Sequence, residues 1–297
     1  MEDLGTTIRQ IRLNKGFSQK EIYTGIMSHS FAVRFEQGGH DISATKLFAI
    51  LDNLAISVDE FRFIQQQYQL SPLEQALAKT EADYQQQNFP ALTEWVRTHR
   101  DSDHPFERLV ASYNSIKLLA FDHRHVPITP AVRPAYDKLL ATSNWTLQEL
   151  RLMSLLVPLV ATNQGIAAIP ALTTKVIKNS RHYLTPFGDP FDIQAKLLDY
   201  YGTVFQCALN WQDYDQARQQ KAHLMAIKVA NLSWDGRLVQ QFWLAIWELY
   251  FGEVTTGQAN LDKIMAIENL FPIVPDTNLR TILTVRQSEA QQYRANH

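Results

Sequence analysis

The stretch Phe17-Ser18-Gln19-Lys20-Glu21-Ile22, followed by Ser28-His29-Ser30-Phe31-Ala32-Val33-Arg34-Phe35-Glu36-Gln37-Gly38, decides how the N-terminal part of this chain folds. Ser18 with Glu21 three residues later is a capping box, which satisfies free amide groups at the start of a helix. Ser28 can cap a second helix, on which Phe31 and Phe35 lie four residues apart on one side. Gly38 follows where a helix favours a left-handed end. Two short helices separated by a tight turn predict a helix-turn-helix.

Further short helices are expected on both sides of this pair. Leu4, Ile8 and Ile11 recur at i, i+4 and i+7, which is the apolar stripe of a preceding helix. Ser43 can cap a following helix whose inward residues are Leu47, Ile50, Leu51 and Leu54. A second capping box, Ser57-Val58-Asp59-Glu60, starts another helix around Phe61 and Ile64. The sequence therefore predicts a five-helix domain over residues 1–66.

The composition of the whole chain favours an all-α protein with more than one unit. Its 297 residues are about twice the length of a typical single domain. Hydrophobic residues make up 45% and charged residues 20%, which excludes a disordered chain. Only 11 glycines and 12 prolines are present, fewer than turn-dense β-sandwiches and barrels need. The net charge of −2 gives no global attraction to nucleic acid or to an anionic membrane.

The sequence also predicts a cytoplasmic protein without a membrane span. The acidic start of the chain lacks the basic and apolar regions of a signal peptide. The most apolar stretch, residues 152–172, contains Pro158, Gly165 and Pro170, so we expect two buried helices joined by a turn. The single cysteine, Cys207, cannot form an intrachain disulfide, and its apolar neighbours favour a buried role.

Residues 67–297 predict an array of helical hairpins. Helical patterns continue to the C-terminus, with candidate turns near residues 88–90, 122–130, 163–165, 211–213 and 251–253. The last three turns are about 40 to 50 residues apart, a spacing typical of stacked helical repeats. We therefore expect a right-handed α-solenoid that is similar to TPR arrays, although the strict 34-residue signature of those repeats is absent.

The N-terminal motifs resemble the phage-repressor (XRE/Cro-type) DNA-binding domain, with its "LSQEEL", "SRSxISRxENG" and "GVSLDEL" segments in order over residues 4–64. The resemblance implies that the second helix of the motif reads base edges in the major groove. Arg34 is the candidate for a bidentate contact to guanine, beside His29 and Ser30. Ser18 and Gln19 would lie against a phosphate, with Ser28 in the same DNA-facing set. Arg12 and Glu36 match a structural pair that ties the first helix of the domain to the third.

Alternative interpretations of this domain remain open. Phe31 is either a core residue or a contact to a thymine methyl group, and His29 is either DNA-facing or an ordinary exposed histidine. Residues 1–66 contain seven Lys or Arg and eight Asp or Glu, so the domain is not basic overall. Gly39-His40-Asp41 lacks the lysine or arginine that relatives often carry there for the DNA backbone. We therefore expect modest affinity per domain and binding to two half-sites as a dimer.

The whole chain resembles the Rgg/GadR/MutR regulators, a group of peptide-pheromone receptors in Gram-positive bacteria. Besides the helix with Ser30, Phe31, Phe35 and Gly38, the segment Trp145-Thr146-Leu147-Gln148-Glu149-Leu150 is similar to that family's "WTxxEL". The resemblance implies a homodimeric quorum-sensing transcription regulator. In such a protein residues 1–66 bind operator DNA, while residues 67–297 dimerise and bind a short peptide on a concave face.

Polar and aromatic residues on the expected inner helices are the candidates for that peptide. An inner groove suits an extended peptide because side chains can hydrogen-bond its backbone. Arg151 is the preferred residue, since a cation suits a peptide carboxylate. The other candidates are Asn114, Lys117, Gln206, Asn210, Tyr200, Tyr201, Trp243 and Trp247. The alternative is that the polar residues face solvent and the aromatic residues belong to the core.

Other classes of function find less support in the sequence. Sequence motifs of hydrolases, zinc proteases, P-loops and dinucleotide sites are absent, so neither an enzyme nor a cofactor is expected. Asp122-His123-Arg124-His125 runs into two prolines and predicts a polar loop rather than a metal site. The remaining alternatives are a regulator that responds to stress or a small molecule without a peptide, and a helical-repeat scaffold that does not bind DNA.

Overall fold

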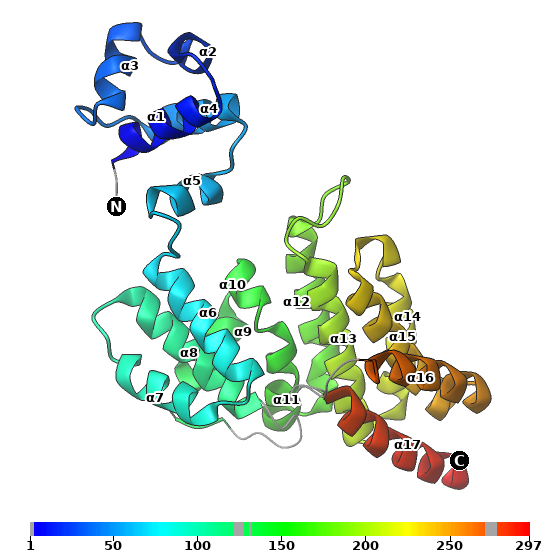
Figure 1. Ribbon diagram of the computed structural model, residues 1–297. Helices are drawn as coiled ribbons and strands as arrows, with labels where there is room; N and C mark the ends of the chain where they lie inside the picture. The colour runs from blue at the N-terminus through cyan, green and yellow to red at the C-terminus, as the bar shows by residue number, and fades with distance from the viewer. Residues whose placement is uncertain (1–2, 121–127, 131, 271–277) are drawn as a thin grey trace. The chain divides into compact units, whose positions relative to one another are not determined.

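The computed structural model describes residues 3–120, 128–130, 132–270 and 278–297, and in these ranges the regular structure is helical apart from one isolated bridge between Thr185 and Gly188 (Figure 1). The prediction of an all-α protein is confirmed. The chain divides into two compact units, Met1–Lys79 and Thr80–His297. The boundary expected after residue 66 falls in the loop between α5 (Val58–Gln65) and α6 (Pro72–Gln85), and α6 itself crosses the division between the units.

The first unit contains the predicted helices, which are α1 (Leu4–Asn14), α2 (Gln19–Tyr23), α3 (His29–Glu36), α4 (Ala44–Leu54) and α5. The serines that precede α2, α3, α4 and α5 all cap their helices, because each hydroxyl accepts a hydrogen bond from a backbone N–H in the first turn. The complete capping box at Ser18 and Glu21 is present. Local sequence signals thus determine where these helices begin.

Apolar residues from all five elements form the core of the first unit, among them Ile8, Ile22, Phe35 and Leu54. Gly5 lets α1 approach α3 closely, since a Cβ atom at that position would lie only 1.7 Å from the backbone oxygen of Phe35. The core therefore sets α3 directly against α1, with its outer face turned away from the core.

The second unit consists of helices that pack in consecutive pairs (Figure 1). The pairs α7 with α8, α13 with α14 and α15 with α16 make extensive contacts, while α11, α13, α15 and α17 connect one pair to the next. After α6 the described helices are α7 (Phe89–His99), α8 (Pro105–Ala120), α9 (Arg133–Ala141), α10 (Leu147–Leu150), α11 (Met153–Gln164), α12 (Ile169–Ser180), α13 (Ile193–Asn210), α14 (Tyr214–Ala226), α15 (Trp234–Phe251), α16 (Val254–Glu268) and α17 (Asn278–Asn296). The predicted array of helical hairpins is confirmed.

One continuous apolar core extends from Tyr113 in α8 to Tyr293 in α17. The apolar stretch forms α11 and α12, which are separated at Gly165 as the sequence predicts. Within the described residues, none of the helices combines the length and apolar character that crossing a bilayer requires. Cys207 is buried in α13, and burial raises the pKa of its thiol to about 12. All six tryptophans of the chain belong to this unit.

Candidate functional site

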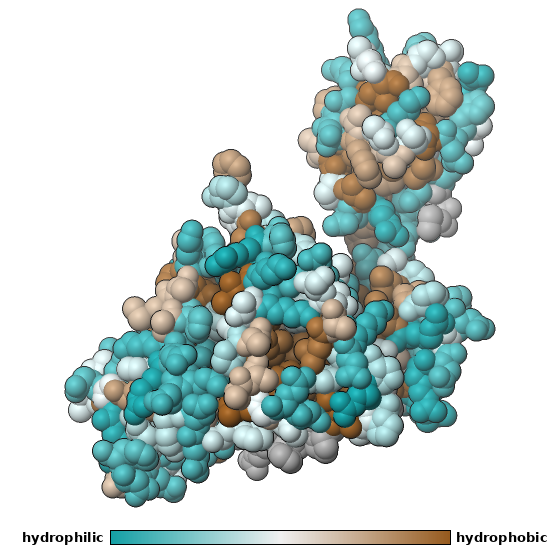
Figure 2. All heavy atoms as spheres, turned by 180° about the vertical axis from the view of Figure 1, so that it is seen from behind, coloured by the Kyte–Doolittle hydropathy of each residue, from teal (hydrophilic) through white to brown (hydrophobic). Residues whose placement is uncertain are grey.

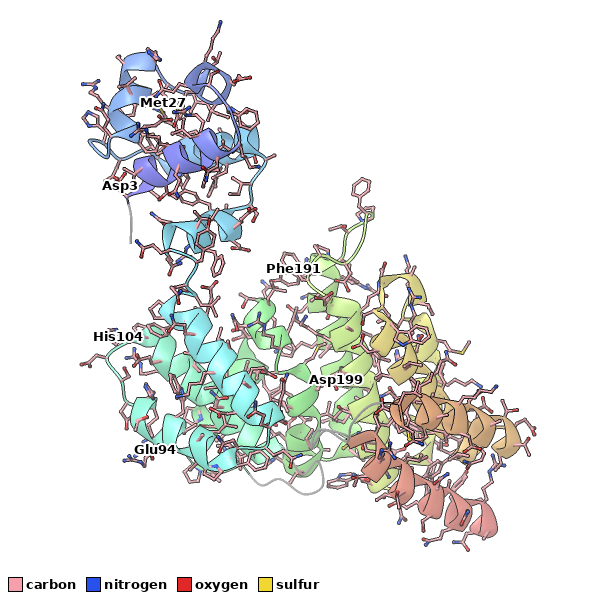
Figure 3. The ribbon with its side chains drawn as sticks, in the orientation of Figure 1. Asp3, Met27, Glu94, His104, Phe191 and Asp199 are labelled. Carbon is pink, nitrogen blue, oxygen red and sulfur yellow. The ribbon has the colours of Figure 1, made fainter. Side chains whose placement is uncertain are left out.

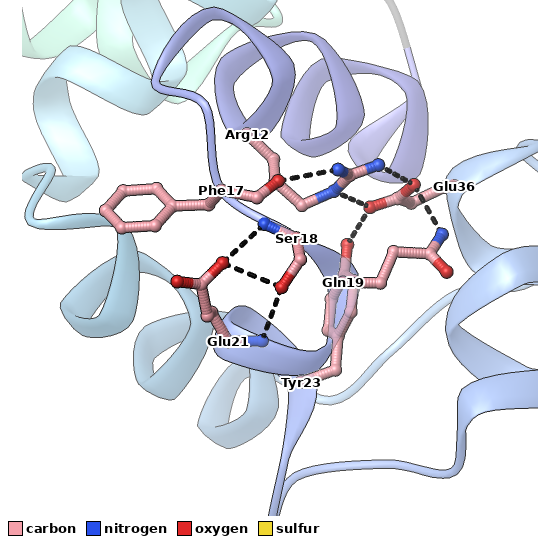
Figure 4. A network of polar contacts seen from close by, with 7 residues as sticks. All are labelled: Arg12, Phe17, Ser18, Gln19, Glu21, Tyr23 and Glu36. Carbon is pink, nitrogen blue, oxygen red and sulfur yellow. Dashed lines mark hydrogen bonds and ion pairs between the residues drawn. The ribbon is translucent and has the colours of Figure 1, made fainter.

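A buried ion pair connects the first three helices of the first unit (Figure 4). Arg12 in α1 donates to both carboxylate oxygens of Glu36 in α3, from Nε to Oε1 at 2.6 Å and from Nη2 to Oε2 at 2.7 Å. Gln19 Nε2 and Tyr23 Oη, both from α2, also donate to this carboxylate, each at 2.8 Å. The side chains of Arg12 and Glu36 are only 8% and 3% exposed. The expected structural pair is thus present and includes α2 as well.

The hydrogen bonds of this network decide the charge of Glu36. Burial alone would raise the pKa of this carboxyl, but the bonds from Arg12, Gln19 and Tyr23 outweigh it and hold the pKa below its ordinary value. The pKa of Arg12 is raised, mainly by its hydrogen bonds to Glu36. Arg12 also donates from Nη1 to the backbone oxygen of Phe17 at 2.8 Å. A charged, fully bonded pair therefore fixes α2 and α3 relative to α1.

The outer face of α3 presents the predicted base-reading side chains to solvent. His29, Ser30 and Arg34 are all exposed, and Ser28 accepts a hydrogen bond from the N–H of Phe31 at 3.3 Å. The Nε atom of Arg34 lies 3.4 Å from the backbone oxygen of Ser30. Among the described residues no carboxylate pairs with Arg34, so its guanidinium is available to a ligand.

The two residues predicted to meet a phosphate have structural partners in this conformation. The Ser18 hydroxyl is exposed, and it donates to Glu21 Oε2 at 2.7 Å within the capping box. Gln19 is half-buried, with its amide nitrogen bonded to Glu36. The Ser18 hydroxyl and the Gln19 amide thus already form hydrogen bonds within the domain, so a phosphate would have to compete with Glu21 and Glu36 for them.

A stack of side chains beside α3 brings in Lys46, a cation whose place near this helix cannot be recognised from the sequence. The ring of Phe31 is half-buried at the edge of the core and stacks on His40, with ring centres 5.3 Å apart and planes 13° apart. Lys46, from the first turn of α4, places its Nζ atom 5.5 Å from the centre of the same ring. The segment Gly39-His40-Asp41 has no lysine or arginine, but Lys46 comes close to it through the fold.

In the second unit, Arg151 lies near a second cation. It is exposed at the end of α10, with Nη1 3.4 Å from Gln148 Oε1. The pKa of Lys196 in α13 is lowered, first by burial and also by the positive charge of Arg151. Lys196 donates to the backbone oxygens of Phe191 at 2.6 Å and Asp192 at 3.3 Å. Lys196 was not predicted, because nothing in the local sequence relates it to Arg151.

A stripe of polar residues follows one side of α13, which otherwise buries most of its surface; Figure 3 labels one member, Asp199. We call it the α13 stripe, and its members are Lys196, Asp199, Thr203, Gln206 and Asn210. Near its N-terminal end, Ser154 of α11 donates to Asp199. At its C-terminal end, Arg286 of α17 contacts Asn210 Oδ1 at 2.6 Å and the backbone oxygen of Gln206 at 3.3 Å. The side chain of Asn210 therefore faces α17, and Gln206 contacts α17 through its backbone oxygen.

The other predicted groove residues are more deeply placed than expected. Asn114 is buried in α8 and donates to the backbone oxygen of Val110 at 3.0 Å. Lys117 pairs with Glu81 at 2.5 Å and lies over the ring of Tyr84. Neither residue is open to a ligand in this conformation. Both lie on α8 and have no described contact to the α13 stripe.

The aromatic candidates agree with the alternative interpretation that they belong to the core. Tyr200 is buried and shares a hydrogen bond of 2.9 Å with Thr173, and Tyr201 stacks on His223. Trp243 is buried against Gly202, where a Cβ atom would lie 2.4 Å from the indole nitrogen. Trp247 is half-buried and donates to the backbone oxygen of Arg218 at 3.1 Å.

A separate pocket of about 290 Å³ lies between α15, α16 and α17. Leu249, Val254 and Ala290 give it an apolar lining, and its polar lining comes from Gln258, Gln287, Gln291 and Arg294. Within the described ranges no three histidine, cysteine or acidic side chains gather as a metal site would need. Residues 122–125, for which a polar loop was expected, lie outside the described residues.

Comparison with known proteins identifies the fold of this chain. No protein-family model and no curated protein matches the sequence. Solved structures of the same architecture, a helix-turn-helix unit followed by helical hairpins, match along the whole chain. The fold that the Rgg-type resemblance implies is therefore confirmed.

Three of these structures illustrate the likeness. A protein from Listeria monocytogenes EGD-e, assigned as a transcriptional regulator, has 18% identity and a TM-score of 0.72 over 98% of both chains. The Streptococcus dysgalactiae SHP pheromone receptor Rgg2 has 17% identity and a TM-score of 0.68 over 99% of this chain and 100% of its own. PrgX in complex with cCF10 has 13% identity and a TM-score of 0.61 over 99% and 94%. At these identities the likeness shows the fold alone.

Proposed function

We propose that this protein is a cytoplasmic transcription regulator that binds operator DNA as a homodimer and is controlled by a short peptide in its second unit. The observation that carries the proposal is the exposed row His29, Ser30 and Arg34 on a helix that a buried ion pair holds in place. The full-length fold similarity to a pheromone receptor, Rgg2, supports the kind of function.

The chemistry of the first unit suits DNA. A guanidinium can bond both O6 and N7 of guanine, which makes Arg34 the residue that selects a base. Lys46 would contact a phosphate, adding affinity without sequence preference. Arg12 and Glu36 neutralise each other inside the unit. The outer face of α3 therefore keeps the positive charge of Arg34, which pairs with no carboxylate among the described residues.

The chemistry of the second unit suits a peptide with a free carboxylate. Arg151 and Lys196 supply two positive charges near one end of the α13 stripe, where Asp192 and Asp189 also act on Lys196. Farther along the stripe Asp199, Thr203 and Asn210 have partners within the protein, so the half-buried Gln206 is the side chain that we propose bonds a peptide backbone. The peptide would act by binding one arrangement of the helical array better than another, because only a difference in affinity shifts an equilibrium.

Selection of bound sequences from random duplex DNA, followed by titration, tests the DNA half of the proposal. Arg34→Ala should lose about 1–3 kcal/mol of discrimination at one base pair, roughly a 5- to 150-fold loss of preference. Lys46→Ala is the matched control, which should weaken binding to all sequences alike and reduce the salt slope by about one. Unchanged base preference in Arg34→Ala would contradict its role. Absence of salt-sensitive DNA binding by the wild type would favour the scaffold alternative.

A library of short synthetic peptides, each with a free or an amidated C-terminus, tests the peptide half. Binding should require the free carboxylate and should fall in Arg151→Ala and Lys196→Ala, while Lys263→Ala on the exposed side of α16 should bind as the wild type does. Equal binding of amidated peptides would contradict the carboxylate site. The pocket between α15 and α17 favours the alternative of a small-molecule effector, which Ala290→Phe should then exclude.

A further inference from the structure

Two neighbouring loops of the second unit expose an unusual amount of apolar surface. The loop between α12 and α13 exposes Phe187 and Phe191, and the end of α14 with the start of α15 exposes Met225, Val229 and Trp234. A hydrogen bond of 2.7 Å from the N–H of Lys228 to Gln194 Oε1 connects the second loop to the start of α13, directly after the first. We call these five residues the loop patch.

Phe187 lies at the tip of a short hairpin, which Figure 2 shows as a projection from the second unit and Figure 3 shows above the labelled Phe191. Thr185 and Gly188 exchange backbone hydrogen bonds at 3.0 and 3.3 Å, and Phe187 N–H donates to the Thr185 hydroxyl at 3.2 Å. Asp189 fixes the base of the hairpin by accepting from the N–H groups of Ile193 and Gln194. Phe187 itself is fully exposed. These hydrogen bonds order the backbone that carries Phe187, which lowers the entropy lost when a partner covers the ring.

The size of the loop patch matches the apolar part of a protein interface. Its three aromatic rings alone expose on the order of 400 Å², given roughly 200 Å² for a whole aromatic side chain. An area of a few hundred Å² is the size of the largest apolar patch of a typical monomer, and such patches are often functional. A stable interface covers about 800 Å² on each partner, and roughly half or more of that area is apolar. The apolar area of the loop patch is therefore large enough for the centre of such an interface.

The charges around the loop patch favour a second copy of this chain as the partner. Lys228 and Arg237 are exposed beside it, and so are Asp192 and Asp235. A two-fold interface brings the same surface together twice, so a mixture of both signs can pair with itself. An anionic membrane would instead select a surface of one sign.

We propose that the loop patch is the surface through which two copies of the second unit associate, which rests on the homodimer of the proposed function. Phe187 and Trp234 are the anchors, and the charged residues around them form the rim. Burial of these two rings against the partner copy supplies most of the affinity.

Sedimentation velocity of the full-length chain over a range of concentrations tests this surface. Phe187→Asp and Trp234→Asp should each raise the dimer dissociation constant by about tenfold or more. Leu270→Asp is the matched control, because Leu270 is exposed and apolar but lies at the end of α16, and it should associate as the wild type does. Phe187 and Trp234 are both exposed, so replacing them removes little buried apolar area from the folded protein and should leave it folded. Far-UV circular dichroism checks that each variant is folded.

A crosslinking variant gives a second measurement. Phe187→Cys introduces an exposed thiol, while the natural Cys207 is buried with a raised thiol pKa and should not react. A short bis-maleimide should then link two copies of Phe187→Cys, whereas Leu270→Cys should stay unlinked.

Three results would overturn the inference, each with a different meaning. Dimers of unchanged affinity in both patch variants would place the interface elsewhere while leaving the homodimer intact. A wild type that is monomeric at every concentration would contradict the homodimer itself. Binding of monomers to phosphatidylglycerol vesicles that Phe187→Asp abolishes would assign the loop patch to a membrane.

Discussion

The two units of this protein each bury an arginine, but they surround it differently. Arg12 in the first unit meets a carboxylate that is itself only 3% exposed, and two further side chains bond the same carboxylate. Arg286 in the second unit is 4% exposed, but its partner Glu289 is 44% exposed. Arg286 directs its other bonds to Asn210 and a backbone oxygen of α13.

The difference lies in which elements each ion pair joins. In the first unit, moving α3 away from α1 would leave two buried charges without partners, which is expensive. In the second unit, Arg286 and Glu289 both lie on α17, so their ion pair does not join two helices. Arg286 contacts α13 through its bonds to Asn210 and to the backbone oxygen of Gln206. The buried ion pair of the first unit therefore joins two helices, whereas the partly exposed ion pair of the second unit lies within one helix.

The largest expected effect comes from breaking the buried pair. Glu36→Gln keeps the shape but leaves the charge of Arg12 buried without a counter-ion, and should destabilise the first unit by about 3–5 kcal/mol. Hydrogen–deuterium exchange of peptides from α1 and α3 measures the local opening free energy. Glu21→Gln, at an exposed carboxylate of the neighbouring capping box, is the control and should change it little. An equal effect of the two substitutions would contradict the role given to the buried pair.

The next effect compares two glycines at close approaches. Gly5→Ala would place a methyl group 1.7 Å from the backbone oxygen of Phe35, so α1 and α3 must separate, at a cost of about 3 kcal/mol. Gly202→Ala would meet the side chain of Trp243, which can shift, at a cost of about 1–2 kcal/mol. Thermal unfolding with exchange measured separately in each unit tests the order, and a larger loss at Gly202 would reverse the comparison.

A smaller effect is expected from acid. The pKa of Glu36 is lower in the folded protein than its ordinary value of 4.5, so the folded state binds fewer protons than the unfolded state in that range. The stabilisation is complete above pH 4.5 and is lost as the pH falls through the lowered value. The first unit of the wild type should therefore weaken over this window, and Glu36→Gln should show a flatter profile. A wild-type profile as flat as that of the variant would show that Glu36 does not titrate with folding.

The smallest effect is expected from Glu289→Gln. Because this carboxylate is 44% exposed, removing its charge should cost less than about 1 kcal/mol in unfolding of the second unit. Local exchange in α17 should nevertheless increase. A loss as large as that of Glu36→Gln would mean that the two arginines are held alike, against the comparison above.

The sequence predicts the elements of this fold well because their signals are local. Ser18, Ser28, Ser43 and Ser57 act within the next three residues, so their capping role can be recognised without the fold. The Arg12–Glu36 pair followed from the family resemblance, since 24 residues separate its members and no periodicity relates them.

The sequence predicts the candidate sites less completely, because their contacts depend on how distant helices pack. Lys46 reaches Phe31 only through the position of α4 against α3. Arg286 reaches Asn210 across 76 residues, so Asn210 appeared to be a free groove residue in the sequence. Asn114 looked like a polar surface residue, yet the core of the second unit surrounds it. Helical periodicity identifies a face of a helix but not which neighbour covers that face.

The distribution of tryptophan has a practical consequence. Every indole of this chain belongs to the second unit, and the first unit contains none. Tryptophan fluorescence, excited at wavelengths where tyrosine absorbs little, therefore reports on the second unit alone. If the first unit binds DNA as we propose, adding DNA to the intact protein should leave this tryptophan emission unchanged unless binding alters the helical array. The natural protein thus carries its own label for measuring whether its two halves communicate.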